Sequence, residues 1–331
     1  MLIARTAVLA LAVLAVAPAP ARAQAPVVRL AGATDCPVNP NCIPGFKRVY
    51  GFDPSGSFVK LAVADGGIEA LDDGLAEVAV AFSSNPELSR PDILALRDDK
   101  RMITPDHIVP VVRTKLLRRY GAGLRRTLDA ASRVLDTLAL RGLNQEVIDG
   151  RLPEAVGGEF ADSNGLDRGA RRRRGPRIVV GYQDFAENKT LAYMYSEALR
   201  GAGYRVTVHS VHGLRPAAVR ALRTGRIGMY PGYSGSLLAY LGGRSLERAL
   251  ARIHARPLTR SPAQDRNGFA MKRDVAASLG IAKLSDLSRY WPAARRPPGS
   301  TPTRCRASSG RSRPRACSTC RAPGSSRRAP A

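Results

Sequence analysis

Short apolar runs alternate with helical patterns along residues 177–294, and this alternation limits the fold more than any other feature of the chain. Strands are predicted at residues 177–182, 204–211, 227–230 and 267–271, and helices at residues 187–200, 216–224, 234–241 and 274–279. Gly201 and Gly203 lie near the end of the first helix, and Gly225 ends the second. A β–α alternation of this kind predicts an α/β fold in which a mostly parallel sheet carries helices on both faces.

The first half of the chain repeats part of this pattern. Residues 70–83 and residues 221–234 share one spacing: a helix, a glycine that ends it, a strand and then a serine. This is either a coincidence between two ordinary αβ units or a sign that both units end at the same kind of place. Because sheets of this type bind ligands beyond the carboxyl ends of their strands, the second interpretation places Ser83 and Tyr233 at a common cleft.

The first 25 residues have the pattern of a signal peptide. Arg5 precedes an apolar run at residues 8–16 that is too short to span a bilayer, and small-x-small cleavage sites occur at residues 21–23 and 23–25. Prolines after the apolar run disfavour the alternative of a buried helix. No cysteine lies at the cleavage point, and no later segment has 18 consecutive apolar residues. We therefore expect a soluble periplasmic or secreted protein without a lipid anchor or stable membrane insertion.

The formal net charge of +25 suggests a nucleic-acid binder, but the position of the charges argues against one. Residues 168–177 hold six arginines, residues 295–331 hold ten, and neither segment contains an acid. These sixteen charges leave 25 − 16 = +9 for the rest of the chain. The excess belongs to a linker and to a tail rich in Arg, Ser, Pro and Ala, which we expect to be disordered.

Two cysteines lie close together near the predicted mature N-terminus. Cys36 and Cys42 enclose five residues and can close a small disulfide loop in an oxidising compartment. The alternative is two free thiols, which export disfavours. Cys317 and Cys320 have the spacing of a metal or redox pair, but neither a second pair nor a histidine accompanies them in the tail.

Four segments of the second block carry a resemblance to a known family. Residues 178–188 resemble the opening strand and loop of betaine/choline/carnitine-type (osmoprotectant) ABC transporter substrate-binding proteins, where the text reads roughly VGSKNFTEQ. Residues 221–236 are similar to the family's ALKSGEIDLYPEYTGT, residues 266–271 to NNTYAL, and residues 280–287 to GIKTISDL. Together these matches are specific, although each one alone would be weak.

The first block resembles the other half of the same family, so the halves stand in swapped order. The resemblance divides the chain into a signal peptide (1–25), a C-terminal-half block (26–167), an Arg/Gly linker (168–176), an N-terminal-half block (177–294) and a tail (295–331). One interpretation is a circular permutation, which is tolerated where termini are close and exposed. The other is a truncated tandem. We favour permutation, because the two blocks together supply one nearly complete set of elements.

The resemblance implies a fold and a function. The fold is a two-lobed periplasmic-binding-protein-like (type II) α/β architecture. The function is the extracytoplasmic solute-binding component of an ABC importer, which closes two lobes on a quaternary-ammonium osmoprotectant such as choline or glycine betaine and docks on permease subunits. Such a protein is not an enzyme and needs no cofactor.

The chemistry of a trimethylammonium group defines the candidate site. The group cannot donate a conventional hydrogen bond, so the negative faces of aromatic rings hold it, whereas a betaine carboxylate needs donors or cations. Tyr233 matches the Tyr of YTGT and is the best candidate for an aromatic cage. Phe269 matches the Tyr of NNTYAL, with plain core packing as the alternative. Ser236 keeps a hydroxyl donor, Gln183 replaces a frequent Lys, and Tyr182 adds an aromatic ring.

The remaining candidates are polar. Asn267 supplies an amide or a carbonyl, and Ser83 ends the related αβ unit. In the first block, Asp106 and His107 stand where many relatives place a cage Tyr. Asp106 either attracts a cation directly or is a turn residue after proline. Asn39 lies near the position of a carboxylate-binding Arg in some relatives, and these changes favour choline or another cation over a betaine.

Three other functions compete with solute binding. An enzyme is disfavoured because the sequence lacks the G-x-S-x-G, HExxH, GxxxxGK[ST] and dinucleotide-binding motifs, and its four histidines are scattered. A nucleic-acid binder would act through the arginine segments alone. A truncated or frameshifted fragment would lack a cooperative unfolding transition.

Overall fold

The structure is a computed structural model that describes residues 27–62, 66–166 and 175–293 of the 331-residue chain. The predicted signal peptide, most of the predicted Arg/Gly linker and the predicted tail lie outside the described residues. The remainder belongs to one compact unit.

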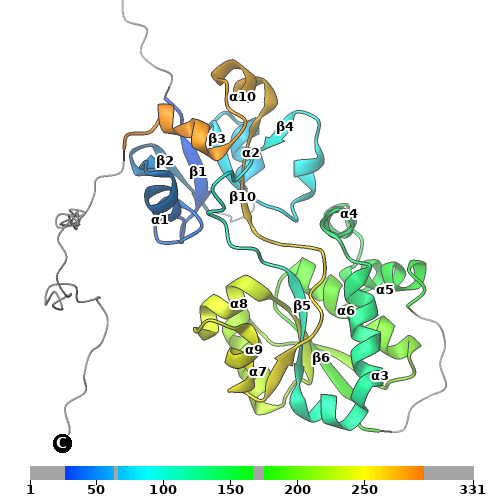
Figure 1. The fold of residues 1–331 in the computed structure, drawn as a ribbon. Coiled ribbons are helices and arrows are strands. Elements are labelled where there is room, and N and C mark those ends of the chain that lie inside the picture. Colours follow the sequence, from blue (N-terminus) through cyan, green and yellow to red (C-terminus); the bar gives the residue numbers. More distant parts are fainter. Residues whose placement is uncertain (1–26, 63–65, 167–174, 294–331) are drawn as a thin grey trace, which may run out of the picture. The chain divides into compact units, whose positions relative to one another are not determined.

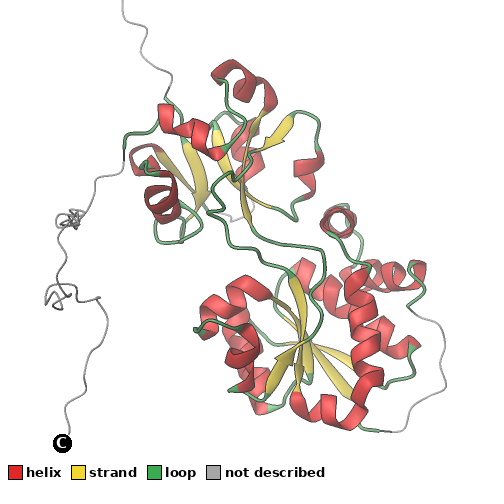
Figure 2. Ribbon diagram, in the orientation of Figure 1, coloured by secondary structure: helices red, strands yellow, loops and turns green. Residues whose placement is uncertain are grey.

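The described residues form two five-stranded sheets, in the orders β2-β1-β3-β10-β4 and β7-β6-β8-β5-β9 (Figures 1 and 2). The strands are β1 (Leu30–Ala33), β2 (Phe58–Leu61), β3 (Val78–Phe82), β4 (Ile93–Ala95), β5 (Ile108–Arg113), β6 (Ile178–Tyr182), β7 (Val206–Ser210), β8 (Met229–Tyr233), β9 (Ala255–Pro257) and β10 (Asn267–Lys272). The chain crosses between the sheets twice, at residues 96–107 and 258–266. The two sheets with their helices are the two lobes of an α/β protein, as predicted.

Each sheet is mostly parallel, as predicted, with four strands in one direction and one strand in the opposite direction. The β1–β2, β1–β3, β6–β7 and β6–β8 pairs are parallel, but β10 runs antiparallel to β3 and β4, and β5 runs antiparallel to β8 and β9. The cause is the crossing of the chain. β5 and β10 are the strands that enter each sheet from the other one, and neither is joined to its neighbours by the βαβ connection that makes strands parallel.

Helices cover both faces of the second sheet. The side chains of β5 show this, because they point alternately into two different cores. Ile108 and Val112 face one core together with residues of α3, α4, α5 and α6. Val109 and Val111 face the opposite core, which α7, α8 and α9 complete. The helices are α3 (Thr114–Arg133), α4 (Thr137–Ile148), α5 (Pro153–Ser163), α6 (Ala186–Gly201), α7 (Arg215–Thr224), α8 (Ser234–Leu241) and α9 (Leu246–Ala251). Successive strand residues point to opposite faces, so a strand between two helical layers is apolar throughout.

The first sheet has the same construction on a smaller scale. Leu30 and Phe269 face a core that contains α1 (Ile43–Gly45) and α10 (Arg273–Leu279). Ala31 and Ala270 face the opposite core with α2 (Gly67–Asp72). Alanines on this second face let α2 pack closely on the sheet.

The elements predicted in the second block match the structure closely, with one extension, whereas α9 and β9 lie in a stretch for which no element was predicted. Helix α8 has the predicted bounds, and Gly225 ends α7 with a positive φ of 83°, a conformation that glycine adopts without strain. The strand predicted at residues 227–230 instead extends to Tyr233 as β8, because Pro231 and Gly232 pair with Pro110 and Val109 of β5. Pairing with a strand far away in the sequence thus overrides the local turn tendency of a Pro-Gly pair.

Neither sheet belongs to one of the two blocks of the sequence. β10 of the second block pairs with β3 of the first, and β5 of the first block pairs with β8 of the second. Helix α5, which ends the first block, packs on α6, which follows the first strand of the second. A Cβ atom at Gly157 of α5 would collide with the backbone of Thr190 and Met194 of α6. The blocks are therefore interleaved rather than arranged side by side.

Replacing Gly157 by alanine should destabilise the protein by about 1–3 kcal/mol, because α5 and α6 must separate to admit the methyl group. Gly158→Ala is the matched control, because a Cβ there would meet only the Glu197 side chain at an ordinary 3.7 Å. The control should be neutral or slightly stabilising, since alanine favours a helix. Thermal denaturation of both variants measures the difference. Equal midpoints for the two would contradict the close packing of these helices.

Candidate functional site

A cleft of about 1840 Å³ opens where the parallel strands of both sheets end. Ala33 ends β1, Phe82 ends β3, Gln183 follows β6 and Tyr233 ends β8, and all four line the cleft. The crossing segments complete its wall. The site is thus at the carboxyl ends of the parallel strands, the position that this class of sheet uses for ligands.

The charge of the cleft wall is opposite to that of the chain. Its titratable side chains include six carboxylates, from Asp35, Glu69, Glu87, Asp106, Glu187 and Asp265. Three guanidinium groups oppose them, from Arg90, Arg215 and Arg266. The described wall therefore has a formal excess of three negative charges in a chain whose net charge is +25. A cation is favoured over an anion in such a cleft.

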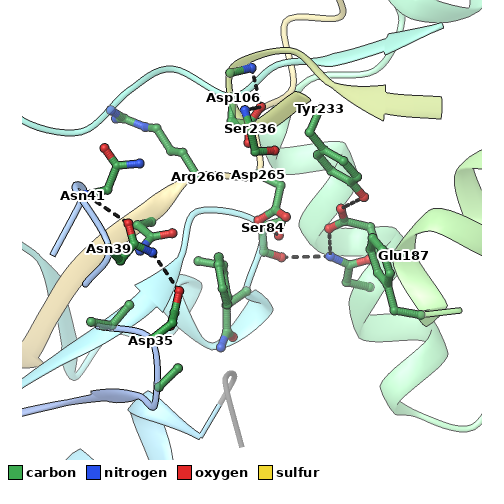
Figure 3. Close-up of a pocket in the computed structure, with 18 of the residues that line it drawn as sticks. Asp35, Asn39, Asn41, Ser84, Asp106, Glu187, Tyr233, Ser236, Asp265 and Arg266 are labelled. Atoms are coloured by element: carbon green, nitrogen blue, oxygen red, sulfur yellow. Dashed lines mark hydrogen bonds between the residues drawn. The ribbon is translucent and has the colours of Figure 1, made fainter. Parts of the chain in front are cut away.

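An aromatic pair lies beside one of these carboxylates. The rings of Phe185 and Tyr233 have centroids 6.0 Å apart and are inclined by 31°. The Tyr233 hydroxyl donates a hydrogen bond to Glu187 Oε1 at 2.7 Å (Figure 3). Burial, together with the negative charges of Glu187 and Asp265, raises the pKa of Tyr233 well above its ordinary value. Tyr233 therefore stays neutral and remains a donor, with 5% of its surface exposed.

Glu187 is also held by its position on α6 and by a side chain of α4. It lies in the first turn of α6, where a negative side chain is favoured by the helix dipole. Asn144 of α4 donates through Nδ2 to Glu187 Oε2 at 2.7 Å and to the Ser84 carbonyl at 3.0 Å. The Ser84 hydroxyl in turn donates to Asp265 at 2.8 Å. Hydrogen bonds thus fix a carboxylate at the hydroxyl of Tyr233, whose ring pairs with that of Phe185.

Five of the eight predicted ligand-binding residues line the cleft: Gln183, Tyr233, Ser236, Asn267 and Asp106. Gln183 is 3% exposed, and its backbone N–H donates to Asn188 Oδ1 at 2.8 Å. Asn267 begins β10. Ser236 and Asp106 meet at the start of α8, where burial raises the pKa of Asp106 against the opposing hydrogen bonds from Ser236 and Gly235.

The other three predictions do not correspond to the cleft wall. Phe269 is 1% exposed and packs on Phe46 with a centroid distance of 4.7 Å, because its position on β10 faces the core. Tyr182 packs against the larger core of the second sheet. The Ser83 hydroxyl donates to the Gln264 carbonyl and accepts from the Arg266 N–H, so it stabilises the second crossing segment. Its neighbour Ser84 lines the cleft instead.

Phe185 and Glu187 were not among the predicted site residues, although both lie in the segment that resembles VGSKNFTEQ. Each is identical to the family residue at its position, and one residue lies between them. The sequence signal for these two residues was an aromatic residue and a carboxylate at the start of a helix that follows a buried strand. Local spacing does not reveal that Tyr233, some 46 residues away, donates to this carboxylate.

The structure joins Cys36 and Cys42 by a disulfide. Residues of this loop line the cleft, among them Asp35, Asn39 and Asn41. Asn41 Oδ1 accepts a hydrogen bond from the Thr104 N–H at 3.2 Å, which ties the loop to the first crossing segment. The disulfide therefore fixes part of the cleft wall.

Comparison with known proteins identifies the family. The substrate binding domain of the ABC-type glycine betaine transport system matches residues 25–163 and 176–311. These segments make up most of the chain, and the protein belongs to this family.

Solved structures of binding proteins are similar in part. They include a phosphate-binding protein of a phosphate ABC transporter from Streptococcus pneumoniae TIGR4 (11% identity, 75% of this chain and 90% of that chain, TM-score 0.40). An ancestral arginine-binding protein bound to arginine has 12% identity over 78% and 90% of the two chains, with a TM-score of 0.37. Apo YehZ from Escherichia coli has 10% identity over 77% and 84%, also with a TM-score of 0.37.

Two kinds of feature are absent from the described residues. Within residues 27–62, 66–166 and 175–293, no group of three His, Cys, Asp or Glu side chains is placed to hold a metal ion. No helix in the same ranges combines the length and apolar character needed to cross a membrane.

Proposed function

We propose that this protein is the exported solute-binding component of an ABC importer for quaternary-ammonium solutes such as choline or glycine betaine. The observation that carries the proposal is the Glu187 carboxylate placed beside the Phe185 and Tyr233 rings in a cleft between strand ends. A methylated cation gains from ring faces and from a nearby negative charge, and it needs no hydrogen-bond acceptor. The family membership supports the transport role.

The aromatic cage is proposed in a revised form. Phe185 and Tyr233 supply the ring faces, Glu187 supplies the charge, and Gln183, Ser236, Asn267 and Asp106 supply the polar wall. Phe269 and Tyr182 are assigned to the cores and Ser83 to the second crossing segment. The signal peptide at residues 1–25 and the periplasmic or secreted location are part of the same proposal, as are the permease subunits as partners.

The interleaved sheets support a single permuted domain over a truncated tandem. A fragment of a tandem would leave its strands without the neighbours supplied by the other half, whereas here β3, β10, β5 and β8 pair across the two blocks. The arrangement also argues against a non-functional fragment. A single cooperative unfolding transition is the expected behaviour of one such domain.

A thermal-shift experiment tests the proposed solute. Millimolar choline should raise the unfolding temperature, because a ligand that binds only the folded state stabilises it by about 2.7 kcal/mol at a hundredfold excess over the dissociation constant. The control is 3,3-dimethyl-1-butanol, which has the shape of choline without its charge and should give little or no shift. If no quaternary amine among choline, glycine betaine and carnitine produces a shift, the proposed solute class is wrong.

A further inference from the structure

The first turn of α8 is already occupied by an anion that belongs to the chain. Asp106 Oδ1 accepts hydrogen bonds from the N–H groups of Gly235 at 2.7 Å and Ser236 at 3.2 Å (Figure 3). The start of a helix has N–H groups without intrahelical partners and carries partial positive charge, so it attracts anions. Burial raises the pKa of Asp106, and these hydrogen bonds oppose that rise because they favour the ionised carboxylate. These two N–H groups at the start of α8 are therefore engaged by Asp106 rather than offered to an anionic solute.

The backbone around Asp106 fixes this carboxylate in place. The Asp106 carbonyl accepts a hydrogen bond from the Asp265 N–H at 3.0 Å. Next to it, His107 exchanges two hydrogen bonds with Ser234, through its N–H at 3.1 Å and its carbonyl at 2.9 Å. A Cβ atom at Gly235 would collide with the Pro105 carbonyl. The crossing segment is thus packed directly on the start of α8, and its position is set by the main chain.

Ser236 is engaged on both sides. Its N–H donates to Asp106, and its hydroxyl accepts a hydrogen bond from Arg215 at 2.8 Å. This is the residue whose hydroxyl the sequence offered as a donor to a solute. A carboxylate arriving here would meet the negative charge of Asp106, which is offset only in part by the positive charge of Arg215, one of whose N–H groups is bonded to Ser236. Like charges in a partly desolvated site are strongly unfavourable.

We propose that Asp106 is a specificity-determining residue that makes the cleft select quaternary-ammonium solutes without a carboxylate, such as choline, over zwitterions such as glycine betaine. This inference rests on the proposed function. The two solutes share the trimethylammonium group and differ at the other end, where choline has a hydroxyl group and glycine betaine a carboxylate. A hydroxyl can donate to an aspartate, whereas a carboxylate is repelled by it. Selectivity of this kind arises from a built-in repulsion as much as from attraction.

Arg266 is a second candidate for the residue that determines which solute the cleft prefers. Its side chain is half-buried and lines the cleft wall, so it is a group that can receive a solute carboxylate. If Arg266 decided specificity, glycine betaine would bind at least as tightly as choline. The order of the two affinities therefore distinguishes the two residues.

Calorimetric titration of the wild-type protein and of Asp106→Asn with both solutes tests the proposal. The wild type should bind choline at least about tenfold more tightly than glycine betaine, and Asp106→Asn should reduce that ratio at least about fivefold. Asp35→Asn is the matched control, because Asp35 also lines the cleft but accepts its hydrogen bond from the Asn39 side chain. It removes the same charge and should leave the ratio unchanged.

Each result has one meaning. Equal wild-type affinities, or tighter binding of glycine betaine, overturn the inference even if Asp106→Asn fails to fold. An unchanged ratio in a folded Asp106→Asn protein, or an equal change in Asp35→Asn, overturns it as well. If the wild type binds neither solute, the proposed function itself fails, which differs visibly from binding both without discrimination.

Discussion

The Tyr233→Ala protein should lose about 10- to 100-fold in affinity for choline. The substitution removes one ring of the aromatic pair, worth about 0.5–2 kcal/mol to a cation, and it also removes the donor that holds Glu187. Because Tyr233 is 5% exposed, the loss of its ring should also lower the unfolding free energy by about 3–5 kcal/mol. Calorimetric titration, performed where circular dichroism shows a folded protein, measures the affinity.

Tyr233→Phe is the control for this prediction. It keeps the ring and most of the packing but removes the hydroxyl that donates to Glu187. Its affinity should lie between those of the wild type and Tyr233→Ala, and its stability should be close to that of the wild type. Unchanged choline binding by a folded Tyr233→Ala protein would exclude this ring from the site.

Glu187→Gln should weaken choline binding by roughly 30-fold, or about 2 kcal/mol. The amide keeps the size of the side chain and removes the negative charge that the proposal places near the solute nitrogen. A charge pair at about 4 Å in a site of intermediate polarity is worth a few kcal/mol, part of which is offset by desolvation. The uncharged isostere 3,3-dimethyl-1-butanol should bind the variant and the wild type with similar, weak affinity.

Glu154→Gln is the charge control. Glu154 lies on α5 and pairs with Lys189 at 2.9 Å, and it does not line the cleft. Its removal should change the affinity for choline less than about twofold, as expected for an exposed pair. If both glutamate variants weaken binding equally, a general loss of negative charge explains the effect and the specific role of Glu187 is wrong.

The sequence predicted the elements of the second block well because each has a strong local signal. Helix α7 has an apolar stripe and a glycine at its end, and β6 is a short apolar run. The direction of the two reversed strands could not be predicted in this way. β5 and β10 enter their sheets from crossing segments, so whether they run parallel or antiparallel depends on contacts between residues that are far apart in the sequence.

The site was predicted less completely, for a similar reason. Tyr233, Gln183 and Ser236 were accessible to sequence reasoning because they lie in segments that end at the cleft. Phe269 lies in such a segment too, but its side chain faces the core. A sequence motif does not show in which direction a side chain points. Conversely, the position of the Glu187 carboxylate depends on hydrogen bonds from Tyr233 and Asn144, which lie on other elements.

The central claim is that a methylated cation binds between the Phe185 and Tyr233 rings and the Glu187 carboxylate. A crystal structure of the protein with choline tests it most directly. We expect the choline nitrogen within about 6 Å of both ring centroids and on the side of the rings that faces Glu187. Choline bound elsewhere in the cleft, with these three side chains free of it, would contradict the account.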